Sequence, residues 1–202
     1  MGVLMKRVPD HNGDGIIPPY SAADPAVPGS RSPYSTEWDE VIQRFATSDR
    51  RVEILLGLVA YREAIRGIGI VDGFQWLTGS FVEQIPREPG DVDVVTFFHV
   101  PPGLDSTAAR PLFDSRCAKA QYHCDAYPVP LSYPPGPNAP SHTQAVVSLV
   151  DQTTYWYGLF SHRRITSAWK GFVQLPLTSG EKDAAARDML LALRAEKQRK
   201  AG

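Results

Sequence analysis

Two apolar segments joined by a polar connection place the tightest limit on how this chain folds. The first, Phe74–Leu77, is followed by Thr-Gly-Ser at residues 78–80. The second, Gly90–Val100, opens with Asp91 and Asp93 and continues as an apolar run. Because residues i and i+2 of a strand point to the same face, both aspartate side chains are predicted on one side of the second strand. Its continuous apolar run predicts burial on both faces of a sheet.

The paired carboxylates and the Gly-Ser turn suggest two halves of one phosphate site. Two like charges held this close are unfavourable unless a cation lies between them. Hard divalent cations such as Mg²⁺ prefer carboxylate oxygens together with substrate phosphates. Gly79 allows the backbone to approach a ligand, Ser80 adds a hydroxyl donor, and N–H groups after such a turn attract anions. We therefore expect metal-assisted chemistry on a nucleoside triphosphate.

Gly79-Ser80, about ten further residues and then Asp91-x-Asp93 in a strand resembles the signature of polymerase-β-like nucleotidyltransferases. The phrases GFQWLTGSFVEQ, PGDVDVVTFF, YWYGLFSHRR and WKGF are similar to those of a small bacterial family in that superfamily, over about Pro18–Leu177. The resemblance implies an α/β (α+β) domain with the polymerase-β-like nucleotidyltransferase fold, a mixed central sheet of about four or five strands and flanking helices.

The resemblance also implies an activity. A nucleoside monophosphate would pass from an NTP, with ATP the expected donor, to a hydroxyl group of a protein, an RNA or a small molecule. Asp91 and Asp93 would bind Mg²⁺ or Mn²⁺. Small stand-alone members of the superfamily often modify a partner or belong to toxin–antitoxin and phage-defence loci. A rival interpretation is a binding module that keeps the fold and turns nothing over, and a third is a nuclease or phosphatase that uses the same carboxylates.

A third acidic residue is predicted on the strand Gln121–Val129, where Asp125 interrupts an apolar pattern. An unpaired carboxylate inside such a strand is costly. The resemblance assigns to Asp125 the third acidic position of the superfamily, which binds a metal and helps to deprotonate the attacking hydroxyl. The alternative is a strand-end aspartate bonded to backbone. His123 is expected on the same face, either as an outer group of the site or as a surface histidine.

Three cationic residues are candidates for binding the triphosphate: Arg163, Arg164 and Lys170. A nucleotidyltransferase needs cations that offset the charge of the leaving pyrophosphate. The equal alternative is a basic patch for a protein or RNA partner. Glu83 lies close to the Gly-Ser turn, where it could orient a ligand, but a surface carboxylate is the favoured interpretation.

The remaining chain predicts an extended arm over residues 1–33 and one domain over residues 34–202. Apolar periodicity and capping residues predict further elements. The expected helices are Thr36–Phe45, Asp49–Gly67, Ser106–Ala120, Thr153–Ser161 and Glu181–Arg199, the last capped by Ser179, and a strand is expected at Gly171–Leu177. Ala145–Asp151 is expected to be a separate short apolar segment, after a proline-rich loop over Pro130–Pro140. The arginines of the second helix are expected on a solvated face: Arg50, Arg51, Arg62 and Arg66.

Composition narrows the function classes. A formal net charge of -1 provides no global attraction to nucleic acid. No apolar run approaches the ~20 residues of a membrane span, so we expect a cytoplasmic protein without membrane contact. The two cysteines, Cys117 and Cys124, fit no zinc pattern and are expected to be reduced. Asp10–Ser21 begins like a calcium loop but lacks the acidic twelfth residue, which favours a simple turn.

Overall fold

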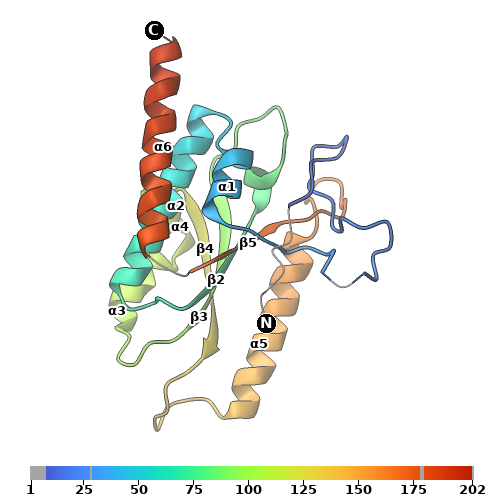
Figure 1. Ribbon diagram of the computed structural model, residues 1–202. Coiled ribbons are helices and arrows are strands. Elements are labelled where there is room, and N and C mark those ends of the chain that lie inside the picture. The colour runs from blue at the N-terminus through green and yellow to red at the C-terminus, as the bar shows by residue number, and fades with distance from the viewer. Residues whose placement is uncertain (1–7, 28, 178–179, 202) are drawn as a thin grey trace.

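The computed structural model describes residues 8–27, 29–177 and 180–201, and it places them around one five-stranded mixed sheet (Figure 1). The strand order is β1-β5-β2-β3-β4. The strands are β1 (Tyr34–Ser35), β2 (Gly73–Thr78), β3 (Val92–His99), β4 (Cys124–Ser132) and β5 (Val173–Pro176). β3 runs antiparallel to β2 and parallel to β4. The expected mixed α/β architecture with a mixed sheet and flanking helices is confirmed.

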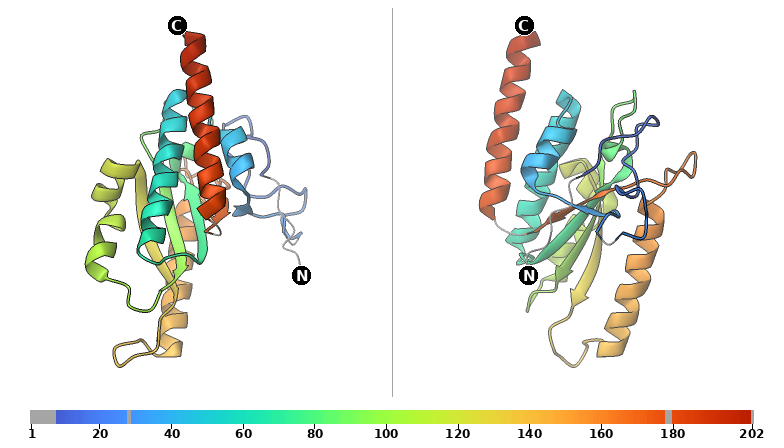
Figure 2. Two further views of the ribbon diagram at one scale, coloured as in Figure 1. Left: turned by 60° about the vertical axis from the view of Figure 1, so that its left-hand side comes forward. Right: turned by 45° about the vertical axis from the view of Figure 1, so that its right-hand side comes forward.

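Helices cover both faces of this sheet. They are α1 (Trp38–Phe45), α2 (Asp49–Gly67), α3 (Ser106–Ala109), α4 (Ser115–Tyr122), α5 (His142–Phe160) and α6 (Gly180–Ala201), with 3₁₀ turns η1 (Gly79–Val82) and η2 (Arg110–Leu112). α1, α2 and α6 lie on one face, whereas α5 crosses the other (Figure 2). Among the described residues, no helix combines the length and the apolar character that crossing a membrane requires.

Alternate residues of β3 pack into two separate hydrophobic cores, one on each face of the sheet. Val92 and Val94 belong to the larger core beneath α1, α2 and α6, whereas Val95 and Phe97 belong to the smaller core beneath α5. The predicted burial of this strand on both faces is therefore confirmed. Asp93 has the parity of Val95 and Phe97, so its side chain lies on the α5 face. Polar residues at this end of the strand consequently meet the helix that covers the smaller core.

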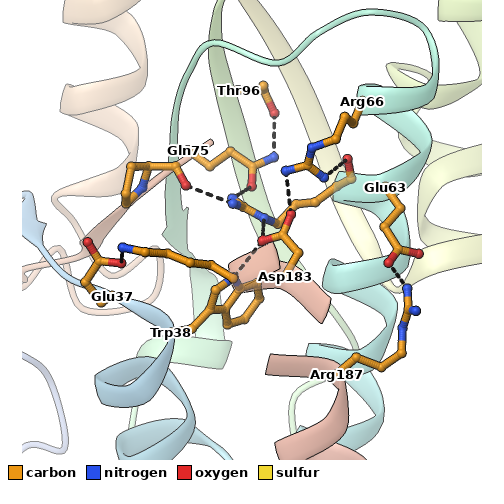
Figure 3. Close-up of polar contacts among 11 residues, drawn as sticks. Glu37, Trp38, Glu63, Arg66, Gln75, Thr96, Asp183 and Arg187 are labelled. Atoms are coloured by element: carbon orange, nitrogen blue, oxygen red, sulfur yellow. Dashed lines mark hydrogen bonds and ion pairs between the residues drawn. The ribbon is translucent and has the colours of Figure 1, made fainter. Parts of the chain in front are cut away.

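A buried ionic network ties α6 to the sheet (Figure 3). Asp183 is 0% exposed; its Oδ1 accepts hydrogen bonds from Arg62 Nε at 2.8 Å and from Trp38 Nε1 at 2.7 Å. Its Oδ2 accepts one from Arg66 Nη2 at 2.7 Å. Arg62, 2% exposed, also donates from Nη1 to Gln75 Oε1 at 2.9 Å. Because Gln75 lies on β2, the network joins α2 and α6 to the strand that leads into the Gly-Ser turn.

The predicted solvated arginine face of α2 is wrong for two of its members. Arg62 is buried in the network above, and Arg51 is buried near the start of the same helix, about three turns earlier. Arg51 donates to the carbonyl oxygens of Phe81 at 2.5 Å and Glu83 at 2.7 Å. The partners of Arg51 and Arg62 lie far away in the sequence, so helical periodicity alone could not identify these two arginines as buried. Arg51 thereby fixes the backbone that follows the Gly-Ser turn.

Two predicted elements have different bounds in the structure. The single helix expected over Ser106–Ala120 is divided into α3, η2 and α4, because Pro111 lies in η2 and Asp114 caps a new helix by accepting from Cys117 N. The strand expected from Gln121 begins instead at Cys124, after His123 ends α4 with a left-handed φ of 55°. β4 then extends to Ser132, into the predicted proline-rich loop.

The segments expected at Ala145–Asp151 and Thr153–Ser161 form one helix, α5. A capping box between Ser141 and Gln144 opens it. Ser179, expected to cap the last helix, lies outside the described residues. In the N-terminal segment, the Ile16 and Ile17 side chains are buried against the rest of the chain.

Candidate active site

A pocket of about 500 Å³ lies where β2 ends and β3 and β4 begin. Residues from the C-terminal part of α5 and from the loop that follows it form the opposite wall. All eight residues singled out from the sequence line this pocket: Gly79, Ser80, Asp91, Asp93, Asp125, Arg163, Arg164 and Lys170. The structure therefore brings together three segments that are widely separated along the chain.

Sheet register places the acidic residues. Asp93 pairs with Thr78 on β2 and with Asp125 on β4, so the end of the Gly-Ser strand and two carboxylates form one row across the sheet. Asp91 immediately precedes β3. The prediction that Asp91 belongs to this strand is therefore wrong. Burial, followed by the charges of Asp91 and Asp125, raises the pKa of Asp93. The carboxylate cluster thus disfavours its own negative charge when no added cation is present.

Gly79 is required by its position next to Asp93. It has a φ of 78°, a left-handed value that disfavours other residues, and a Cβ at this position would overlap the Asp93 carboxylate. Gly79 and Ser80 open the 3₁₀ turn η1, and Lys170 Nζ donates to the Gly79 carbonyl at 3.2 Å. The Gly-Ser turn and the Asp93 carboxylate are therefore in direct contact.

Asp125 is held by groups from α4 and β4. Ser115 Oγ donates to Asp125 Oδ1 at 2.5 Å, and Lys119 Nζ donates to Oδ2 at 3.1 Å. Burial alone raises the pKa of Asp125, but hydrogen bonds from Ser115, Tyr127 and Lys119 together bring it below its ordinary value. Asp125 is consequently ionised and fixed in orientation.

Lys119 bridges two of the three carboxylates. Its Nζ lies 2.9 Å from Asp91 Oδ2 and 3.1 Å from Asp125 Oδ2. The hydrogen bond to Asp91 is the largest cause that raises the pKa of Lys119. Sequence reasoning missed this residue, since a lysine in a polar helix carries no distinguishing signal; its place six residues before Asp125 is the only hint.

Glu83 anchors the cationic wall of the pocket. It is buried, and its carboxylate accepts from Lys170 Nζ at 2.7 Å and from Arg163 Nε at 3.1 Å. The prediction of a surface carboxylate is therefore wrong. Lys170 is itself buried, so it stabilises the turn at Gly79 as well as the pocket wall. Arg164 is exposed, and its charge lowers the pKa of Asp93.

His123 lies outside the pocket. Its Nε2 is 3.5 Å from Glu53 Oε1 on α2, and it does not line the pocket wall. Of the two roles left open for His123, contact with the site as an outer group finds no support in these contacts.

The donor set suits a hard divalent cation in kind. Asp91, Asp93 and Asp125 offer carboxylate oxygens, and burial together with the two neighbouring carboxylates raises the pKa of Asp93. Among residues 8–27, 29–177 and 180–201, however, no three acidic, His or Cys side chains are already grouped as a ligand set. The ammonium of Lys119 lies between two of the carboxylates.

The pocket as a whole combines both signs of charge. Four carboxylates and five cationic side chains line it: Glu83, Asp91, Asp93 and Asp125 against Arg87, Lys119, Arg163, Arg164 and Lys170. Such a lining suits a ligand that has an anionic part and is accompanied by a metal ion. Arg87 and Lys119 were not among the candidate site residues, and for Glu83 a surface position was favoured over a role in the site.

The chain belongs to a family of unknown function, DUF6932, whose model matches residues 9–176. The matched region contains every residue that lines the pocket. Comparisons with curated proteins and with solved structures give no match.

Proposed function

We propose that this member of the DUF6932 family is a metal-dependent nucleotidyltransferase with a polymerase-β-like arrangement of its site. The observation that carries the proposal is the contact between the Gly-Ser turn and the acidic cluster: Gly79 has room for no Cβ because the Asp93 carboxylate lies against it. Asp125 lies beside Asp93 on the adjacent strand. A phosphate cradle in contact with paired carboxylates is what metal-assisted transfer from an NTP requires.

Each side chain has a defined task in this proposal. Asp91, Asp93 and Asp125 would hold Mg²⁺ or Mn²⁺, which when bound neutralises charge on the phosphates. Ser80 and the backbone N–H groups of η1 bind the triphosphate. Asp125 accepts the proton of the acceptor hydroxyl. The hydroxyl oxygen forms a bond to the α-phosphorus, the α–β phosphoanhydride bond breaks, and pyrophosphate leaves.

The cationic wall offsets the charge of the leaving pyrophosphate. Arg164 is exposed and is the cation best placed to contact a ligand, whereas Arg163 and Lys170 already pair with Glu83. These two shape the wall and supply its positive potential. The proposal thus divides the three predicted cations into one direct contact and two supporting residues.

The acceptor is a hydroxyl group of a protein, an RNA or a small molecule, and ATP is the expected donor in the cytoplasm. The loop after α5 supports a large acceptor, since Ile165 lines the pocket and is 94% exposed. An apolar side chain this exposed at the rim is suited to contact with a partner molecule. A role in a toxin–antitoxin or phage-defence system stays an expectation from the resemblance.

A second candidate function is a nucleotide- or partner-binding module without turnover. One observation favours it: Lys119 pairs with Asp91 and Asp125 and so neutralises them in the absence of metal. Such a module binds an NTP and releases no pyrophosphate, so the two candidates differ in a measurable product.

The test is incubation of the protein with each α-labelled NTP and Mg²⁺ or Mn²⁺ in cell extract. The Asp91→Ala/Asp93→Ala variant removes two of the proposed ligands. The matched control is Asp39→Ala/Asp188→Ala, which removes two exposed carboxylates outside the pocket. We expect label on a protein or RNA band, with pyrophosphate release, from the wild type and the control only. NTP binding without label or pyrophosphate from any form would favour the binding module.

A further inference from the structure

Lys119 occupies a particular place in the acidic cluster. It projects from α4, which packs beside β4, and its ammonium lies within hydrogen-bond distance of carboxylates on two different segments. Asp91 comes from the loop before β3, and Asp125 comes from β4. These two segments are brought together by sheet pairing alone, so the ammonium bridges carboxylates that would otherwise repel each other.

This bridge differs from an ordinary surface ion pair. Exposed pairs contribute little to stability because water screens them. Here the Asp125 carboxylate is mostly buried, and its other oxygen is already bonded to Ser115. Asp93, also mostly buried, lies directly beside Asp125 in the sheet. The ammonium therefore pairs with two carboxylates, and a third lies beside them, in a partly desolvated site where a cation has a stronger effect.

The lysine side chain is also able to leave. It is 44% exposed, and a lysine ammonium is a compact charge on a flexible four-carbon stem. An arginine, with a planar fork, would hold the carboxylates in a more fixed geometry. Since Lys119 lines the pocket, a displaced ammonium stays close to any ligand bound there.

We infer that Lys119 is a resident counter-cation that holds the proposed metal-binding carboxylates together and must be displaced before a divalent ion binds to Asp91 and Asp125. The inference rests on the proposed function and adds a regulation of the same site. Free metal binds weakly because it competes with the ammonium. A metal that arrives with a polyphosphate binds better, because the polyphosphate offers the displaced ammonium a new anionic partner.

Mn²⁺ binding to the nucleotide-free protein tests this inference, with the free ion measured by electron paramagnetic resonance. Lys119→Met removes the competing charge and keeps the length of the apolar stem. We expect it to bind Mn²⁺ at least about tenfold more tightly than the wild type, because it loses two competing charge-assisted hydrogen bonds, each worth about tenfold or more. Lys119→Arg keeps a cation in place and should not show this gain.

Two further variants make the result specific. Lys200→Met removes a lysine whose ammonium pairs with Glu196 on α6, outside the pocket, and should bind Mn²⁺ as the wild type does. Adding Asp91→Ala to Lys119→Met should abolish the gain. Circular dichroism checks folding, and Mn²⁺ should raise the melting temperature of Lys119→Met more than that of the wild type.

The outcomes separate the inference from the proposed function. Unchanged or weaker Mn²⁺ binding by folded Lys119→Met overturns the inference, as does the absence of Mn²⁺ binding by every form. Tighter binding by Lys119→Met, with no nucleotidyl transfer by any form, supports the exchange of lysine for metal and refutes the transferase. Transfer by the wild type, with unaltered Mn²⁺ binding in Lys119→Met, supports the transferase and overturns the inference.

Discussion

Replacing Asp183 by asparagine is expected to destabilise the protein strongly. The carboxylate accepts hydrogen bonds from Arg62, Arg66 and Trp38 in a fully buried position (Figure 3). Asparagine has a single acceptor oxygen, and its amide group would face a guanidinium donor. Burial lowers the pKa of Arg62, and the Asp183 charge opposes that effect, so the substitution leaves a buried cation without its compensating anion.

The expected magnitude follows from that arrangement. Breaking a buried ion pair by removing one partner costs about 3–5 kcal/mol of the free energy of unfolding. For a chain of this size, 1 kcal/mol corresponds to roughly 2–4 °C in melting temperature. We therefore expect Asp183→Asn to lower the melting temperature by roughly 10 °C.

Urea unfolding followed by circular dichroism measures this cost. Asp188→Asn is the matched control, because it makes the same chemical change at an exposed position of the same helix. The control should unfold within about 0.5 kcal/mol of the wild type. A loss below about 1 kcal/mol in Asp183→Asn would refute the view that this network holds α6 against α2 and β2.

Two further substitutions probe the site and the N-terminal segment. Gly79→Ala should cost about 1–3 kcal/mol of stability and weaken NTP binding, because alanine disfavours a positive φ and its Cβ overlaps Asp93. Urea unfolding measures the first effect and calorimetric titration the second. The control Gly90→Ala, at an open position, should show neither effect. His11 donates to the Val82 carbonyl at 2.9 Å, and burial lowers its pKa below 6.5. The unfolded state therefore binds more protons below about pH 6.5, so the free energy of unfolding falls as the pH drops through that window. In urea unfolding between pH 7.5 and 5.5, His11→Asn should flatten this dependence. An unchanged slope in His11→Asn would contradict the role of His11.

The elements that local pattern controls were predictable from the sequence. The apolar periodicity of residues 38–45 and 49–67 predicted α1 and α2, and the continuous apolar run of β3 predicted a strand buried on both faces. The row formed by Asp93 and Asp125 was anticipated from the family resemblance and depends on parallel pairing of β3 with β4. These features depend on short-range spacing and on one strand pairing.

The features that were missed depend on partners distant in sequence. Arg62 is separated from Asp183 by 121 residues, and Glu83 from Lys170 by 87. Nothing in the local sequence pattern therefore marks Arg62 or Glu83 as buried. The break between α3 and α4 depends on Asp114, whose side chain caps the start of α4. An aspartate can also lie within a helix, so its presence alone does not predict the break. Lys119 was missed because its role exists only once two strands bring Asp91 and Asp125 together.

The most direct test of the proposed site is a crystal structure with Mn²⁺ and a non-hydrolysable NTP analogue, in which anomalous scattering locates the metal. The proposal predicts a Mn²⁺ peak among the carboxylates of Asp91, Asp93 and Asp125. The phosphates should lie against the backbone of Gly79 and Ser80. A bound analogue with no Mn²⁺ at these aspartates, or phosphates placed away from the Gly-Ser turn, would contradict the proposed nucleotidyltransferase site.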